Sequence, residues 1–177
     1  AGGLAPRSIQ RRLSGVRSFM KYLIREGTLK SNPGADVAAP QVARRLPDTL
    51  DADQMARLLK IEGSEPDTVR DRAMLELFYS SGLRLAELTG LDLGDVDLAD
   101  NTVRVTGKGD KTRIVPVGRF AREAVMAWLA IRAESADAGE QALFVSNRGT
   151  RISPRTIQNR VRYWAQRAGL PRRVYPH

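Results

Sequence analysis

The chain has 177 residues, 42% of them hydrophobic, which is enough for one folded domain or for one domain and part of another. It contains no cysteine and a single histidine, His177, so a disulfide framework, a thiolate metal site and a histidine cluster for zinc are excluded. The formal net charge of +9 favours a polyanionic partner.

Basic residues concentrate towards the two ends of the sequence. Residues 1–50 contain 9 basic against 3 acidic side chains, residues 51–100 contain 5 against 12, and residues 101–177 contain 15 against 5. This distribution indicates two surfaces that grip a nucleic acid, and a solvated basic protein is the plainer alternative. Because no apolar run approaches the roughly 20 residues that span a bilayer, we expect a soluble, cytoplasmic protein without a membrane partner.

The first 37 residues predict one amphipathic helix followed by a short tail. Apolar residues recur at helical spacing from Ile9 to Leu23, and Gly27 is expected to end the helix. The opposite stripe carries the residues that we expect to contact DNA phosphates here: Arg11, Arg17, Lys21 and Arg25. One helix cannot bury its own apolar face, so residues 1–37 are interpreted as the C-terminal part of a helical domain, and the proline-bounded residues 38–47 as a linker.

The remaining residues, 48–177, predict helices around one β-hairpin. Asp51 is expected to cap a helix, Pro66 to open a second that ends near Gly82, and a short helix with Arg84 and Glu87 to follow. Alternating residues from Asn101 to Val117 predict a hairpin with Lys108 at its tip.

After the hairpin we expect a helix around Trp128, a possible strand at Ala142–Ser146, and a last helix from Ser153 and Pro154 to Gly169. The fold class is therefore mainly α with a small antiparallel β-hairpin or sheet (α+β). The residues of this region that we expect to contact DNA are Lys111, Arg113, Arg155, Arg160 and Arg162.

Arg84, Glu87 and Lys108 are candidates for phosphodiester chemistry. Arg84 follows a glycine turn and offers a planar fork for two phosphate oxygens, and Glu87 lies on the same helical face, where it could orient that fork. Lys108 on a glycine-flanked tip could protonate an alkoxide leaving group. The alternatives are an ordinary surface ion pair for Arg84 and Glu87, and a solvated turn residue for Lys108.

Acidic residues between positions 92 and 100 do not indicate a metal nuclease. They crowd one turn-rich segment without the glycine bend or closing glutamate of a calcium loop, so we interpret them as turn and cap residues. No cofactor or metal is expected. Tyr175, near His177, lies in an irregular tail, and a catalytic role for it is disfavoured.

Taken together, residues 81–91, the Asp95-Val96-Asp97 turn and residues 105–117 resemble the tyrosine recombinase (phage integrase) family, most closely its bacterial XerC/XerD branch. The likeness covers nearly the whole chain. It implies that residues 1–37 end a core-binding domain that clamps DNA and that residues 48–177 are the N-terminal portion of the catalytic domain. We therefore expect a chain clipped at both ends.

The resemblance also implies an activity and a set of roles. The family cuts one DNA strand with a tyrosine, forms a 3′-phosphotyrosyl bond and rejoins the strand without metal or ATP. Arg84 resembles the first catalytic arginine, Glu87 the acidic residue that supports the pocket, and Lys108 the general acid on the 5′-oxygen. His177 resembles the first residue of the His-x-x-Arg motif, and the tyrosines that match no nucleophile are Tyr22, Tyr79, Tyr163 and Tyr175.

The function expected from this resemblance is site-specific recombination by the parent protein, in chromosome or plasmid dimer resolution, with this chain inactive in strand cleavage. The implied partners are double-stranded DNA, other recombinase protomers in a tetramer, and an accessory activator. Three alternatives stay open: a mobile-element integrase, a catalytically silent DNA-binding module, and an RNA-binding protein.

Overall fold

The computed structural model describes residues 3–41, 49–107, 109 and 111–170. The chain divides into two compact units, Ala1–Pro47 and Asp48–His177, and each is described by itself. The assignment of these residues to a DNA-clamp domain, a linker and a catalytic domain stays a prediction. Most of the linker, residues 42–47, lies outside the described residues.

The first unit is built on one long helix, α1 (Pro6–Arg25), which begins with a proline and ends just before Glu26 and Gly27. None of its residues is buried, and the apolar side chains of Val16 and Phe19 are 47% and 56% exposed. The described part of this unit therefore leaves the apolar stripe of its own helix open, as the sequence predicts for one helix with a short tail.

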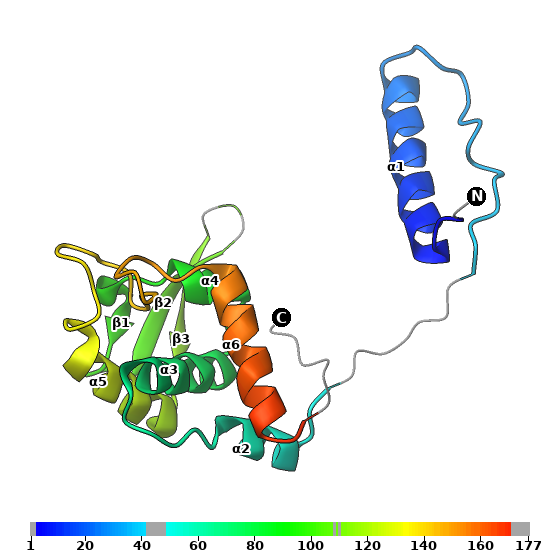
Figure 1. Cartoon of the computed structure of the whole chain (residues 1–177). Helices are drawn as coiled ribbons and strands as arrows, with labels where there is room; N and C mark the ends of the chain where they lie inside the picture. The colour runs from blue at the N-terminus through cyan, green and yellow to red at the C-terminus, as the bar shows by residue number, and fades with distance from the viewer. Residues whose placement is uncertain (1–2, 42–48, 108, 110, 171–177) are drawn as a thin grey trace. The chain divides into compact units, whose positions relative to one another are not determined.

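The second unit combines helices with a small sheet (Figure 1). Its helices within the described residues are α2 (Ala52–Leu59), α3 (Pro66–Ser81), α4 (Leu85–Gly90), the 3₁₀ turn η1 (Leu93–Asp95), α5 (Arg119–Arg132) and α6 (Pro154–Arg167). The predicted starts at Asp51, Pro66 and Ser153 are confirmed: Asp51 and Ser153 accept hydrogen bonds from the backbone N–H groups of Gln54 and Thr156, and Pro66 opens α3.

A three-stranded antiparallel sheet in the order β1–β2–β3 carries the predicted hairpin. Its strands are β1 (Val96–Asp97), β2 (Thr102–Thr106) and β3 (Thr112–Pro116). In this register Val103 lies opposite both Val96 and Val115, and Arg113 lies opposite Val105. The fold class, mainly α with a small sheet, is confirmed, whereas β1 was not predicted because two residues are too few for an alternating pattern.

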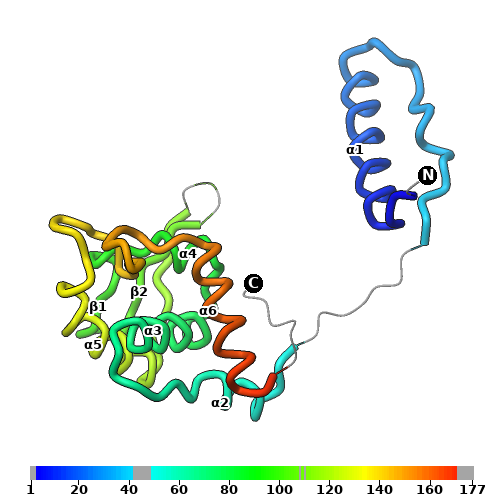
Figure 2. Tube along the Cα trace, viewed as in Figure 1, coloured from blue at the N-terminus to red at the C-terminus, as the bar shows by residue number. Residues whose placement is uncertain are grey.

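The core lies between the sheet and the helices that pack against it. Helices α3 and α5 lie side by side (Figure 2), and α4 contacts both β2 and α6. Met74 and Leu77 from α3, Trp128 from α5 and Val103 from β2 are almost inaccessible to solvent. Burial of side chains this large contributes about 2 kcal/mol each, so this core fixes the positions from which α4 and the hairpin project.

The predicted strand at Ala142–Ser146 is wrong. Ala142 and Val145 each form only an isolated bridge, to Asp92 and Arg151. Side chains of α5 satisfy the backbone there instead: Trp128 Nε1 donates to the Leu143 carbonyl at 2.8 Å, and Arg132 Nε to the Ala142 carbonyl at 3.0 Å. The apolar run is therefore a buried irregular segment, which periodicity alone does not distinguish from a strand.

A buried ionic network joins α3 to α6. Asp71 is fully buried, and its Oδ1 accepts hydrogen bonds from Nε and Nη2 of Arg70 at 3.2 and 3.0 Å. Its Oδ2 accepts from Trp164 Nε1 at 2.8 Å and from Arg160 Nε. Because two helices meet at one carboxylate, this network sets the position of α6 on the unit.

Candidate active site

The turn between α3 and α4 holds Arg84 at the surface on an ordered backbone. Leu83, just before it, is buried, and Arg84 itself is the extended N-cap residue of α4. Its side chain is 73% exposed. Among the described residues its guanidinium has one partner, Glu87, so most of the fork faces solvent.

Glu87 accepts four hydrogen bonds from two arginines although its side chain is only 2% exposed. Arg84 donates its backbone N–H to Oε2 at 2.8 Å and its Nη1 to Oε1 at 2.9 Å. Arg113, on β3, donates Nη1 to Oε1 at 2.7 Å and Nη2 to Oε2 at 3.0 Å. The bidentate pair with Arg113 is the strong, planar form of a carboxylate contact.

These contacts keep Glu87 ionised. Hydrogen bonds from Arg113 lower the pKa of the Glu87 carboxyl to about 2; burial opposes this effect, and the bonds from Arg84 reinforce it. The same carboxylate raises the pKa of Arg113. Glu87 is therefore a charged acceptor at neutral pH, suited to orient arginines and unsuited to donate a proton.

The base of the hairpin lies against the same carboxylate. Gly107 donates its backbone N–H to the Lys111 carbonyl at 2.9 Å, and the hydroxyl groups of Thr106 and Thr112 lie 3.2 Å apart across the strands. A Cβ on Gly107 would lie 3.3 Å from Glu87 Oε1, closer than most side-chain contacts. A glycine at this position thus lets the hairpin approach the carboxylate.

The structure brings together two of the four predicted catalytic residues, Arg84 and Glu87. The other two, Lys108 and His177, lie outside the described residues. The described geometry offers an exposed guanidinium, held at Nη1, for the oxygens of an anion such as a phosphodiester. The catalytic roles of all four residues stay predictions.

The basic residues predicted to bind DNA in the first unit differ in their surroundings. Arg11 and Lys21 are exposed on α1, and Arg25, also exposed, lies 5.4 Å from the centre of the Tyr22 ring. Arg17 instead binds the tail that follows its helix: its Nε donates to the Gly34 carbonyl at 2.7 Å, and its Nη2 to the carbonyls of Ala35 and Val37. The pattern that placed Arg17 on a DNA-facing stripe missed this structural use.

In the second unit, two predicted DNA contacts also have buried acceptors inside the protein. Arg113 pairs with Glu87, and Arg160, with a side chain 25% exposed, pairs with Asp71. Lys111 and Arg155 are exposed, and Arg162 donates to Asn159 at 3.3 Å. The periodicity of a helix or a strand predicts which residues face solvent but does not reveal which arginine reaches an acidic residue on another element. DNA contact by these residues stays a prediction.

Sequence reasoning missed Arg151, which closes the other end of α4. Its Nη1 donates to the carbonyls of Thr89 and Leu91 at 3.0 and 3.1 Å, and its Nη2 to Asp92. A cation at the C-terminal end of a helix satisfies free carbonyls and complements the helix dipole. No local signal marks this residue, because its partners lie about 60 positions earlier in the chain.

The turn and cap interpretation of the aspartates is confirmed for Asp95 and Asp97. Asp95 accepts the Asp92 N–H and a bond from Arg104, and Asp97 accepts the N–H groups of Ala99 and Asp100. No group of three or more acidic or histidine side chains in the described part of the chain could hold a metal ion.

None of the described helices is long and apolar enough to cross a membrane.

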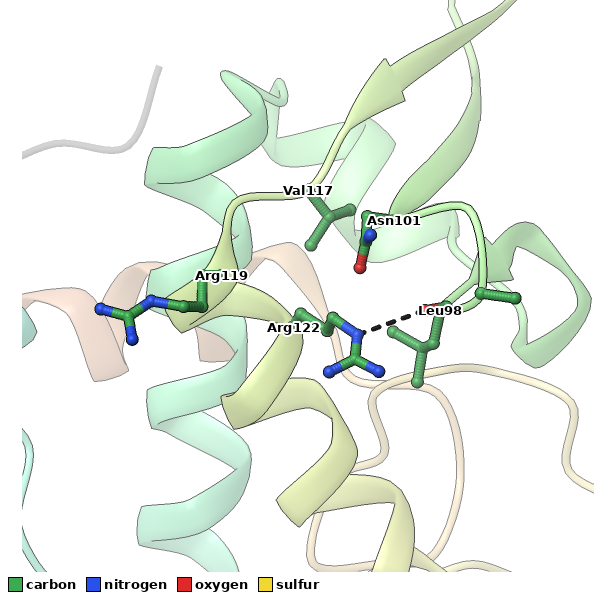
Figure 3. Close-up of a pocket in the computed structure, with 6 residues that line it drawn as sticks. Leu98, Asn101, Val117, Arg119 and Arg122 are labelled. Carbon is green, nitrogen blue, oxygen red and sulfur yellow. Dashed lines mark hydrogen bonds between the residues drawn. The ribbon is translucent and has the colours of Figure 1, made fainter.

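A hollow of about 350 Å³ lies away from Glu87, where α5 begins (Figure 3). It is lined by Leu98, Ala99, Asn101, Val117, Arg119 and Arg122. Arg122 points towards the turn and donates Nε to the Leu98 carbonyl at 3.2 Å, while Arg119 points away and lies over the Phe120 ring. The hollow contains none of the predicted catalytic residues.

Known proteins resemble the chain over almost its full length. Tyrosine recombinase XerC of Shewanella sp. (strain ANA-3) is 49% identical over 175 residues, covering 99% of this chain and 58% of the relative. The crystal structure of XerA recombinase matches with a TM-score of 0.66 and 29% identity, covering 93% of this chain and 55% of that one. XerH bound to difH in a pre-cleavage complex matches with a TM-score of 0.72 and 23% identity, covering 99% and 52%.

The chain therefore spans a little over half the length of the curated relatives it matches. The model of the phage integrase family matches residues 48–177, which include the whole second unit and with it Arg84, Glu87 and the hairpin. The family match and the sequence identity agree: the chain belongs to the phage integrase family of tyrosine recombinases, with a XerC-like sequence.

Proposed function

We propose that this chain is part of a site-specific DNA recombinase that breaks and rejoins strands through a 3′-phosphotyrosyl intermediate. The observation that carries the proposal is the arginine–glutamate–arginine cluster: a buried carboxylate holds an exposed Arg84 beside a lysine-bearing hairpin. Phosphoryl transfer requires positive charge on the non-bridging oxygens and a proton for the leaving oxygen. XerC relatives at 49% identity support the same activity.

In this proposal Arg84 binds the scissile phosphate, and Glu87 holds its guanidinium. Lys108 protonates the 5′-oxygen as it leaves, and His177 assists at the phosphate. The nucleophile is a tyrosine contributed by a part of the full-length protein other than these 177 residues.

The proposed partner is double-stranded DNA, bound by exposed cations on both units. XerH, which has the same fold, was crystallised on its difH DNA. Exchange between two duplexes breaks four strands with one tyrosine each, so we propose a tetramer of protomers on DNA. Resolution of chromosome or plasmid dimers in the bacterial cytoplasm, aided by an accessory activator, is the proposed role, and the XerC relatives favour it over mobile-element integration.

Binding and cleavage by the 177-residue chain test this proposal first. The chain should bind duplex DNA with an affinity that falls steeply with salt, because each neutralised phosphate contributes about 0.9 to the logarithmic salt slope. It should form no covalent adduct on a nicked suicide substrate. Such an adduct would appear as a shifted band in a denaturing gel. An adduct formed by this chain would refute a nucleophile located elsewhere, and tighter binding to structured RNA than to duplex DNA would refute the DNA assignment.

Substitution in the full-length protein tests the site. Arg84→Ala should lower the rate of adduct formation by about a hundredfold or more, since loss of one oriented charge-stabilising group commonly costs that much. DNA affinity should change little, because it is spread over many phosphate contacts. Arg104→Ala is the matched control. The side chain of Arg104 is 57% exposed, and it pairs with Asp95 and not with Glu87. Equal losses of binding and cleavage in Arg84→Ala would refute a catalytic role.

A further inference from the structure

Arg113 links strand β3 to helix α4, which lie far apart in the sequence. It belongs to β3, lies opposite Val105 of β2, and reaches Glu87 of α4 across 26 positions of the chain. Both of its terminal nitrogens are used in this contact, at 2.7 and 3.0 Å. The hairpin is thereby fastened to the helix that begins at Arg84.

The shared carboxylate makes the two arginines depend on each other. Oε1 of Glu87 accepts from both guanidinium groups, and Oε2 accepts from Arg113 and from the Arg84 backbone. Without the fork of Arg113, a carboxylate that is 2% exposed would keep only the bonds from Arg84, whose side chain is 73% exposed. A buried charge compensated on one side only is costly, so the carboxylate would turn towards solvent and take the Arg84 guanidinium with it.

We propose that Arg113 is a positioning residue for strand cleavage, and this inference rests on the proposed function. It locks Glu87 in one orientation, so that the Arg84 guanidinium is already aimed when the phosphate arrives. Only a planar fork with two parallel donors can fill both oxygens in this way, so charge alone does not suffice. A Cβ on residue 107 would lie 3.3 Å from Oε1, so a glycine there lets the base of the hairpin, and with it Arg113, lie against the carboxylate.

This role replaces direct phosphate binding by Arg113, which the sequence suggests. Both terminal nitrogens of Arg113 donate to Glu87, and its side chain is 40% exposed, against 73% for Arg84. The donors that remain on Arg113, Nε–H and one N–H on each terminal nitrogen, lie along the sides of the guanidinium, so a phosphate could not take the planar fork without breaking the bidentate pair. Arg84, with a single bonded terminal nitrogen, is the better placed ligand.

Arg113→Lys in the full-length protein separates the two roles, because lysine keeps the charge and loses the fork. On preformed complexes with saturating DNA, the first-order rate of adduct formation should fall by about tenfold to a hundredfold, as expected for a small misplacement of a reacting group. The dissociation constant and its salt slope should stay within about twofold of wild type. Arg104→Lys, the same change on β2 in an exposed pair with Asp95, should leave the rate unchanged.

A double-mutant cycle with Glu87→Gln tests whether Arg113 affects the rate of cleavage through Glu87. If Arg113 acts through Glu87, Arg113→Lys should cost less than about threefold further in the Glu87→Gln protein, because coupled residues are not additive. A full additional loss in that background would overturn the inference, and so would wild-type cleavage by Arg113→Lys or a rate loss matched by weaker binding. If Arg113→Lys fails to unfold cooperatively, Arg113→Gln, which loses the charge as well as the fork, is measured in the same cycle; it too should cost less than about threefold further in the Glu87→Gln protein, and a full additional loss would overturn the inference.

Failure of this inference is distinguishable from failure of the proposed function. An active wild type that Arg84→Ala inactivates, together with an active Arg113→Lys, removes only the positioning role. A full-length protein that forms no adduct on any duplex removes the proposed function itself.

Discussion

Replacing Asp71 by asparagine should destabilise the second unit strongly, although the two side chains have nearly the same shape. Asp71 is fully buried between α3 and α6, and its two oxygens accept from Arg70, Arg160 and Trp164. An amide keeps one acceptor oxygen and replaces the other by a donor that faces N–H groups. Whichever way the amide turns, at least two donors lose their acceptor.

The magnitude follows from the partners that remain. Removing one partner of a buried ion pair costs about 3–5 kcal/mol. Arg70 keeps a contact of 3.2 Å with Asp67 and bonds to Val145 and Asn147, so we expect the lower end, about 3 kcal/mol. With a urea dependence of about 1–3 kcal/mol per molar, the midpoint of unfolding should fall by about 1–3 M.

Equilibrium urea unfolding of the 177-residue chain, followed by circular dichroism, measures this loss. Asp95→Asn is the matched control: the remaining amide oxygen can still accept the Asp92 N–H, so the change affects only the pair with the exposed Arg104 and should cost about 0.2–1 kcal/mol. A loss for Asp71→Asn no larger than that of the control would refute the conclusion that the Asp71 network holds α6 in place.

Two further predictions concern acid and backbone conformation. Because the folded pKa of Glu87 is about 2 against 4.5 ordinarily, its contribution to stability is complete above pH 4.5 and is lost as the pH falls towards 2. The stability difference between wild type and Glu87→Gln should therefore shrink by at most about 3 kcal/mol between pH 6 and pH 2, and a constant difference in urea titrations would contradict the pKa. Gly149→Ala should lower the thermal midpoint more than Gly82→Ala: both glycines have positive φ, but a Cβ on Gly149 would lie 2.2 Å from Asp137 Oδ1, whereas Gly82 faces open space. Equal shifts of the thermal midpoint in the two variants would show that backbone strain, and not the close contact with Asp137, determines the loss of stability.

Local signals in the sequence were strong at helix ends and in the hairpin. Proline at the first position, capping side chains and positive-φ glycines act within one turn, so the bounds of α3 and α6 follow from neighbouring residues alone. The irregular segment at Ala142–Ser146 misled the same reasoning, because its backbone is satisfied by Trp128 and Arg132 of another element. Apolar character predicts that such a segment is buried and leaves its hydrogen-bond partners open.

By itself, the sequence determined the class of fold, the basic surfaces and the candidacy of Arg84 and Glu87, because these depend on residue type and on spacings of a few positions. Tertiary structure alone decided which cations are left for a ligand. Arg113, Arg160 and Arg17 belong to predicted DNA-facing sets, yet each reaches acceptors 17 or more positions away in the chain. The physical reason is that a buried carboxylate, for Arg113 and Arg160, or a set of backbone carbonyls, for Arg17, must find donors wherever the fold places it, and only the packed chain brings a distant guanidinium within hydrogen-bonding distance.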